Sequence, residues 1–203
     1  MASACSRIAD FWDELTAAWL AGEDPLPDPL PDWYASYEGR GDGQVTRNAF
    51  AEPYVGDLRG TPSDEVRLSR RSDLDSLIVA AARMHREEMG VDPLAVDAPA
   101  WRMRMLSLIE RHWSWVWMRG HEVLFKAELS AWTPEVVQIQ GVYTAPPYRG
   151  QGVARAGLAA VCSDVFREVP RCSLYVNQYN VIAQRVYQRL GFKQADVFAT
   201  VMY

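Results

Sequence analysis

The sequence predicts an α/β fold in which a mixed β-sheet is flanked by helices and preceded by an irregular N-terminal extension. From residue 65 onward, strand and helix patterns follow in the order strand, two helices, three strands, helix, strand, helix, strand. This order is typical of a mixed sheet covered by helices. The charge also changes near residue 62: residues 1–62 carry 11 acidic and 4 basic side chains, and residues 63–203 carry 15 and 17. We therefore predict an acidic, proline-rich extension over 1–62 and one folded domain over 63–203.

The extension contains little that predicts regular structure. Residues 6–21 have apolar side chains at helical spacing, and Gly22 follows as a stop. Residues 23–33, EDPLPDPLPDW, alternate proline with acidic side chains, which is typical of an extended connector. One short helix in about sixty residues cannot bury a core of its own.

The first half of the folded domain contains two helices and three strands. VRLS at 66–69 predicts a short strand. Ser72 and Asp75 form a loose capping box for a helix that ends at Gly90. The Asp92-Pro93 pair predicts a break before the second helix. The predicted ranges are 72–89 and 99–111 for the helices, and 112–118 and 123–132 for the two strands after them.

The second half begins with a strand over 135–144 that ends in two prolines. Pro146 and Pro147 have no backbone donor and cannot continue a strand ladder. After Gly152, apolar side chains recur at helical spacing up to Val169. The remaining predicted elements are a strand over 171–176, a helix over 181–190 and a closing strand over 195–203.

Composition excludes several classes of function. Cys5, Cys162 and Cys172 are too scattered for a disulfide framework, and the three histidines lack the spacing of zinc ligands. We therefore expect no metal. Neither charge region is basic enough for nucleic acid. No apolar run approaches membrane-spanning length, and MASACSRIAD does not resemble a secretory signal, so we expect a cytoplasmic protein with no membrane partner.

The stretch Arg-Gly-Gln-Gly at 149–152 predicts an anion site. Its glycines precede a helix, and a helix N-terminus offers free N–H groups and the positive end of a dipole. A P-loop is excluded because Val153 and Ala154 follow where Lys-Ser/Thr is needed. A dinucleotide fingerprint fails because Arg155 stands at its third glycine. A plain N-cap loop remains open at this point.

Two further patterns resemble the GNAT acyltransferase family. Arg149, Gly152 and Ala154 match the R/Q-x-x-G-x-G/A core of its pyrophosphate loop. LYVNQYNVIAQRVYQRLGF at 174–192 resembles its second signature, with Asn180, Ala183 and Tyr187 on one helical face. The resemblance covers about 64–203 and is strongest to a bacterial subgroup with an extra N-terminal domain. HREEMGVDP, VLFKAEL, VVQIQGVYTAPPYRGQG, LYVNQYN and FATVMY carry it. Residues 1–62 stand in place of that domain or are a truncated form of it.

This resemblance implies a mostly antiparallel central sheet and an acetyl-CoA-dependent N-acetyltransferase. It implies direct transfer of an acetyl group to a primary amine on a small molecule or peptide, by a monomer or homodimer. Tyr187 matches the acid that protonates the departing thiolate, and Val142 matches the oxyanion donor. The expected acetyl-CoA contacts are Val142, Tyr143, Thr144, Arg149, Gly150, Gln151, Gly152, Val153, Ala154, Asn180 and Ala183.

The general base is open between several polar residues. Glu88 is the first candidate, because it lies on the same helix face as Leu77, Ala81 and His85, at the end that borders the acceptor site in this fold. Glu128 is the second, although it shares a strand face with Lys126 and pairs with it in the plainer interpretation. Gln138 and Gln140 share a strand face with Val142 and either order a water or satisfy neighbouring groups.

Two alternatives remain at this stage. Trp113, Trp115 and Trp117 alternate along one strand, so their indoles share a face; they either pack in the core or form an aromatic wall for an acceptor. A catalytically silent acyl-CoA-binding module with a regulatory or docking role is the alternative function.

Overall fold

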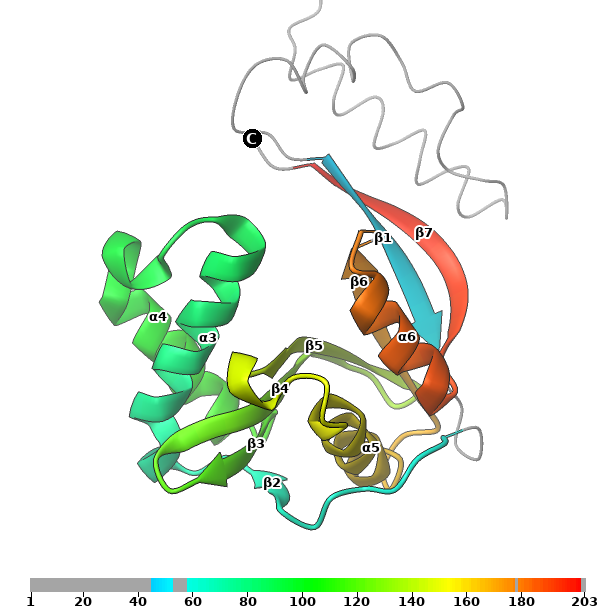
Figure 1. The fold of residues 1–203 in the computed structure, drawn as a ribbon, viewed down its shortest axis with the longest axis horizontal. Coiled ribbons are helices and arrows are strands. Elements are labelled where there is room, and N and C mark those ends of the chain that lie inside the picture. Colours follow the sequence, from blue (N-terminus) through cyan, green and yellow to red (C-terminus); the bar gives the residue numbers. More distant parts are fainter. Residues whose placement is uncertain (1–44, 53–57, 178, 202–203) are drawn as a thin grey trace, which may run out of the picture. The chain divides into compact units, whose positions relative to one another are not determined.

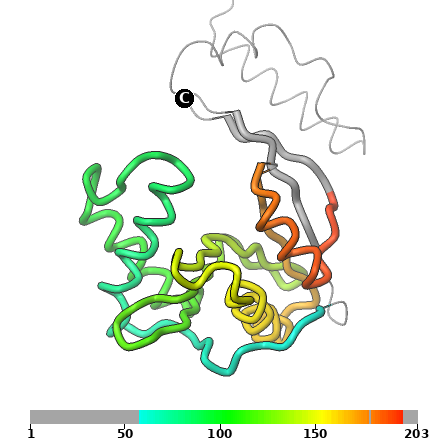
Figure 2. Tube along the Cα trace, viewed as in Figure 1, coloured from blue at the N-terminus to red at the C-terminus, as the bar shows by residue number. Residues whose placement is uncertain are grey.

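The computed structural model describes residues 45–52, 58–177 and 179–201, and it describes side chains over 58–177 and 179–195. The second set corresponds to the coloured tube in Figure 2. The helix predicted over 6–21 and the connector after it lie outside the described residues. The chain divides into a compact unit of residues 47–199 and a second unit of 1–46 and 200–203. The fold and the site below concern the first unit.

Seven strands form one sheet in the order β2-β3-β4-β5-β6-β1-β7 (Figure 1). The pairs β2–β3, β3–β4, β4–β5 and β1–β6 are antiparallel, and β5–β6 is parallel. The predicted mixed, mostly antiparallel sheet is therefore confirmed. The strands are β1 (Val45–Glu52), β2 (Val66–Leu68), β3 (Ser114–Arg119), β4 (Glu122–Trp132), β5 (Val136–Thr144), β6 (Arg171–Asn177) and β7 (Lys193–Val201).

The helices of this unit pack on the two faces of the sheet. They are α3 (Leu74–Met89), α4 (Pro93–Glu110), α5 (Val153–Val165) and α6 (Val181–Leu190), with short 3-10 turns at Arg71–Asp73 and Pro146–Tyr148. Val116 of β3 packs with α3 and α4, whereas its neighbour Trp115 packs with α5. Because successive strand residues point to opposite faces, the two helix pairs cover opposite sides of the sheet.

Strand β1 was not predicted from the sequence. It lies within residues 1–62 and pairs with β6 through the registers Asn48↔Asn177 and Ala51↔Leu174. Its partner follows more than a hundred residues later, so the pairing leaves no local signal in the sequence. A strand's stability depends chiefly on its neighbours in the sheet, which a single sequence does not show.

The start of α3 differs from the predicted capping box at Ser72 and Asp75. The chain first makes the 3-10 turn Arg71–Asp73, and Asp73 is the N-cap residue of α3. The Asp73 carboxylate accepts hydrogen bonds from Arg67 at 2.7 and 3.0 Å and from the Arg70 N–H at 2.8 Å. A buried acid that accepts hydrogen bonds from residues three and six positions earlier therefore sets the start of the helix. Gly90 ends it with φ +71°, as predicted.

Helix α4 begins six residues earlier than predicted. Asp92 accepts a hydrogen bond from the Leu94 N–H at 3.0 Å and Pro93 occupies the first turn, so the predicted break is an N-cap. The helix start predicted at Pro99 corresponds to a second helical segment within α4. Asp97 is non-helical, and its carboxylate accepts from the Ala100 N–H at 2.9 Å. Two helical segments therefore meet at a kink.

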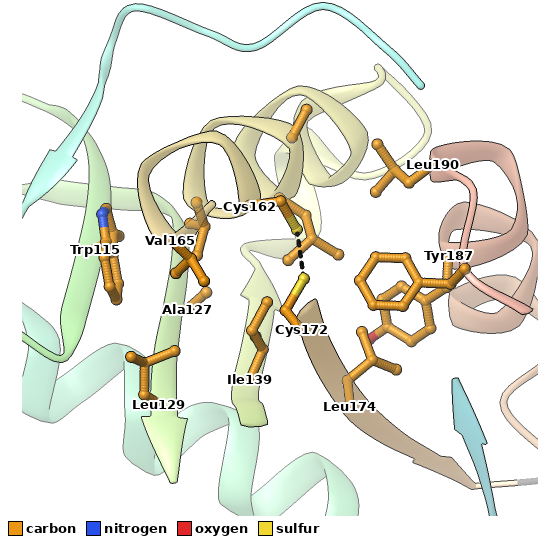
Figure 3. Packing of buried hydrophobic residues seen from close by; sticks show 14 of the residues in the cluster. Trp115, Ala127, Leu129, Ile139, Cys162, Val165, Cys172, Leu174, Tyr187 and Leu190 are labelled. Atoms are coloured by element: carbon orange, nitrogen blue, oxygen red, sulfur yellow. Dashed lines mark hydrogen bonds between the residues drawn. The ribbon is translucent and has the colours of Figure 1, made fainter. Parts of the chain in front are cut away.

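The main core lies between the sheet and α5. Figure 3 shows the thiols of Cys162 on α5 and Cys172 on β6 facing each other among Ile139, Val165 and Leu174, with the sulfur atoms 3.6 Å apart. Both cysteines are free. Trp115 is buried here and donates from Nε1 to Asp164 at 3.0 Å. Trp113 and Trp117 pack against the same core, so the three indoles have the packing role. Within the described part of the chain, no helix is both long and apolar enough to cross a membrane.

Candidate active site

The site begins where β5 and β6 separate. The two parallel strands pair from Val136↔Arg171 to Ile139↔Leu174, and both continue beyond that point. The edge of β5 that faces β6 therefore has no strand partner between Gln140 and Thr144 among the described residues. Unpaired strand edges present N–H and C=O groups that can bind another extended chain.

A bulge at Gly141 shapes this part of β5. The β4–β5 register shifts between Lys126↔Tyr143 and Glu128↔Gln140, and Gly141 has φ +59°. Lys126 lies beneath the bulge and donates to the Gly141 carbonyl at 3.0 Å and to the Glu128 carboxylate at 2.6 Å. This is the ion pair expected from their shared strand face. A Cβ on Gly141 would lie 2.9 Å from Glu128 Oε2, so glycine is needed here for both conformation and space.

A pocket of about 500 Å3 opens at the separated strands. Helix α3, helix α4, the sheet and helix α6 all contribute to its wall. The lining includes Glu88, Glu128, Gln138, Gln140, Val142, Asn180, Ala183 and Tyr187, all of which were singled out from the sequence. Residues as far apart in the chain as Glu88 and Tyr187 thus reach one cavity.

Tyr187 and Asn180 belong to the α6 side of the pocket. Tyr187 is 8% exposed, and Figure 3 shows it beside Leu174 at the edge of the core. Burial, and to a smaller extent the charge of Glu88, raise the pKa of its phenol, so the phenol is protonated near neutral pH. Asn180 caps α6 by accepting a hydrogen bond from the Ala183 N–H at 3.1 Å.

Glu88 belongs to the α3 side. Its side chain keeps contact with solvent and lines the pocket. Loss of hydration raises the pKa of its carboxyl group; Lys126 partly offsets this effect and Glu87 adds to it. A carboxyl group with a raised pKa in a cavity is a physically reasonable proton acceptor near neutral pH. Glu128, by contrast, is committed to Lys126.

The loop at 149–154 lies between β5 and α5. Gly150 and Gly152 have φ of +73° and +83°, and a Cβ on either would meet nothing within 4 Å. The backbone conformation, rather than space, therefore requires glycine at both positions. Gly152 is the N-cap of α5, and Gln151 donates to the Pro147 carbonyl at 2.7 Å. The first N–H groups of α5, including those of Val153 and Ala154, have no acceptor within the helix.

Arg149 is held by groups outside the loop. Its Nη2 donates to Glu87 at 2.6 Å, its Nε donates to the Thr144 carbonyl at 2.8 Å, and its guanidinium lies 5.6 Å from the centre of the Tyr143 ring. The Tyr143 side chain packs with Ala80. These contacts connect the loop to β5 and α3. The side chains of Arg149 and Tyr143 thus point to groups other than the pocket lining.

The pocket residues of α4, which are Trp101, Arg104 and Met105, were missed as site residues. They face the pocket together with Met84 and His85 of α3. The His85 and Trp101 rings are 5.3 Å apart, and the Arg104 guanidinium lies 5.9 Å from the Trp101 ring centre. The spacing 101, 104, 105 marks one helical face, but nothing in the sequence indicates that this face lines a cavity rather than the core.

Comparison with known proteins assigns a family to this region. Residues 95–192 match the model of the acetyltransferase (GNAT) family. A GNAT acetyltransferase from Colwellia psychrerythraea is 16% identical with a TM-score of 0.60, over 78% of this chain and 56% of that chain. This chain thus spans little more than half of that relative. No curated protein sequence matches significantly.

Two further solved structures carry ligands. A predicted acetyltransferase with acetyl-CoA from Clostridium acetobutylicum is 19% identical, with a TM-score of 0.52 over 64% of this chain and 90% of that chain. AAC(6')-Iy, in complex with the bisubstrate analog CoA-S-monomethyl-acetylneamine, is 18% identical, with a TM-score of 0.53 over 68% and 94%. At these identities the likeness establishes the fold. Across the described residues, no group of three or more His, Cys, Asp or Glu is placed to hold a metal ion.

Proposed function

On the premise that residues 95–192 belong to the acetyltransferase (GNAT) family, we propose that this protein transfers an acetyl group directly from acetyl-CoA to a primary amine. The observation that supports this best is one pocket that combines the unpaired edge of β5, a buried Tyr187 and Glu88, whose carboxyl pKa is raised by partial loss of hydration. These are an extended binding edge, an acid and a base, which are the parts that a direct acyl transfer requires.

Acetyl-CoA fits the separated strands in this proposal. Its amide-containing pantetheine arm would pair with the β5 edge at Val142, Tyr143 and Thr144, where strand pairing has stopped. Thr144 Oγ1 is a buried polar atom without a partner in the described part of the chain, as expected for a position that a ligand completes. The Val142 N–H, next to the Gly141 bulge, is the proposed donor to the thioester oxygen.

The diphosphate would bind at the N-terminus of α5. There the backbone N–H groups of Gly150 to Ala154 supply donors and the helix dipole supplies positive potential. Arg149 is a positioning residue in this proposal, because its contacts with Glu87 and the Thr144 carbonyl hold the loop against β5. Asn180 and Ala183 lie on the α6 side of the pocket.

The reaction then needs three proton movements: two protons leave the acceptor nitrogen and one reaches the departing thiolate. Glu88 takes a proton from the acceptor ammonium, and the neutral amine attacks the thioester carbonyl carbon. The carbon–sulfur bond breaks with its electron pair on sulfur, and Tyr187 gives its proton to that thiolate. After the attack the nitrogen is positively charged and loses its second proton to solvent. The products are an N-acetylated amine and CoA; Glu88 releases its proton to solvent and Tyr187 regains one, so one proton is released in all. Burial keeps the phenol protonated until the thiolate forms.

The test is release of free CoA thiol from acetyl-CoA in the presence of a panel of primary amines, with no-acceptor and boiled-protein controls. Transfer predicts release that depends on the acceptor and yields an N-acetylated product by mass spectrometry. Saturable acetyl-CoA binding without release for any amine would contradict transfer and favour a silent acyl-CoA-binding module.

A further inference from the structure

One wall of the pocket carries hydrogen-bond donors that no described residue accepts. Arg104 is the only lysine or arginine among the described lining residues. None of the ion pairs within the described part of the chain includes it, and its guanidinium lies over Trp101. Trp101 Nε1 is a buried donor with no described partner. Buried donors in folded proteins are normally satisfied by protein, water or ligand.

The neighbouring arginine on α4 behaves differently. Arg102 points away from the pocket lining and pairs with Asp75 of α3 at 2.7 Å. Arg86 at the far end of α3 likewise pairs with Asp92 at 3.1 Å. Acidic partners are therefore available to arginines on these two helices, and Arg104 is placed where the lining offers it an aromatic ring instead.

The rest of this wall is apolar or aromatic. Met84 and His85 of α3 and Met105 of α4 line it beside Trp101. The pocket also contains two acids: Glu88, one turn after Met84 on α3, and Glu128 on β4, which is paired with Lys126. Among the described residues, the α4 wall thus combines an exposed guanidinium without an ion pair, a buried indole N–H without a partner and an apolar surface. A guanidinium binds a carboxylate or phosphate through paired N–H donors.

We propose that the acceptor is an amine that also carries an anionic group, and that Arg104 with Trp101 Nε1 binds this anion while the apolar wall contacts the body of the molecule. This inference rests on the proposed transfer, because it describes the acceptor of the same pocket. It favours amino carboxylates, and equally phosphorylated amines, over polyamines and other polycations, whose extra charges would oppose Arg104.

The experiment measures binding of reaction products, which needs no turnover. Calorimetric titrations on the full chain saturated with CoA compare matched pairs with and without the carboxylate: N-acetylphenylalanine against N-acetylphenethylamine, and N-acetyl-γ-aminobutyrate against N-propylacetamide. O-phospho-N-acetylethanolamine against N-acetylethanolamine is the phosphate arm. Each pair is measured in the wild type, in Arg104→Met and in the matched control Arg102→Met.

We expect at least one anionic product to bind about tenfold or more tightly than its neutral match in the wild type and in Arg102→Met. In Arg104→Met the gap should fall below about twofold. The set of pairs, carboxylate or phosphate, that shows the larger affinity ratio between anionic and neutral product identifies the anion that the site prefers. Equal affinity within every pair, a gap that persists in Arg104→Met, or no binding of any product would overturn the inference.

Turnover assays with the free amines distinguish failure of this inference from failure of the proposed function. An Arg104-dependent gap in binding, together with no acceptor-dependent CoA release from the corresponding free amines, would sink the transferase proposal and leave the anion site standing. CoA release with plain alkylamines or polyamines at equal or better efficiency than with amino carboxylates would overturn the anion site and leave the transferase proposal standing. Circular dichroism of each variant identifies any loss that comes from misfolding.

Discussion

Glu88 on α3 and Tyr187 on α6 line one pocket, and the charge of Glu88 contributes to the raised pKa of the Tyr187 phenol. The coupling has a direction that suits the proposed reaction. When Glu88 accepts a proton it loses its negative charge, so one of the effects that hold the phenol protonated disappears. A proton gained on one side of the pocket therefore makes a proton easier to release on the other side.

Replacement of Tyr187 by phenylalanine should lower turnover and spare cosubstrate binding. The substitution removes the acidic hydroxyl and keeps the ring that packs near Phe192, at 5.8 Å between centroids. We expect kcat to fall by about a hundredfold or more, as for loss of a general acid. Steady-state kinetics and an acetyl-CoA titration measure the two effects. A parallel loss of acetyl-CoA affinity would count against the acid role.

Replacement of Glu88 by glutamine should remove one limb of the pH–rate profile. A base acts in its ionised form, so the wild-type rate should rise with pH through the Glu88 pKa, which burial places above the ordinary value for a glutamate. The variant should be slow and should lack that limb. Glu168→Gln, an exposed acid outside the pocket lining, is the control. An unchanged limb in Glu88→Gln would assign the base elsewhere.

Replacement of Gly141 by alanine should destabilise the protein more than the same change at Gly120. The two glycines have nearly identical φ, +59° and +58°, but a Cβ at 120 meets nothing within 4 Å, whereas one at 141 meets Glu128 Oε2 at 2.9 Å. Conformational strain should cost both variants about 1–2 kcal/mol. Denaturant unfolding measures the free energy of unfolding of each variant. The extra loss in Gly141→Ala reports displacement of the Lys126–Glu128 pair. Equal destabilisation would mean that the pair moves without cost.

Asp73 should make stability depend on acid pH. Its hydrogen bonds from Arg67 hold the carboxyl pKa below its ordinary value, so the folded state binds fewer protons there than the unfolded state. The stabilisation is present above about pH 4 and is lost as pH falls through the lower folded-state pKa. Asp73→Asn should therefore be less stable than the wild type at pH 7, with a gap that narrows toward pH 3. Asp64→Asn, at an exposed acid, should show no such gap in urea unfolding.

Much of the domain could be predicted because its elements carry local periodicity. The helix over 181–190 has its predicted bounds, and its Asn180 cap and Gly191 stop are local signals. Strand β1 depends on a partner strand far along the chain. The Asp73 turn and the kink at Asp97 depend on side-chain hydrogen bonds, which periodicity does not encode. The α4 wall of the pocket was missed for a related reason. In the sequence, Trp101, Arg104 and Met105 form an ordinary helical face. This face lines a pocket only because β5 and β6 separate next to it.

The most direct measurement is a calorimetric titration of the full chain with acetyl-CoA, with ATP and NAD as controls, in the wild type and in Gly152→Ala. Gly152 has φ +83° at the N-terminus of α5, so a side chain there should distort the proposed diphosphate loop without meeting any neighbour. The account predicts saturable 1:1 binding of acetyl-CoA alone, weakened about tenfold or more in the folded variant. No acetyl-CoA binding to folded wild-type protein, or equal binding of ATP and NAD, would contradict it.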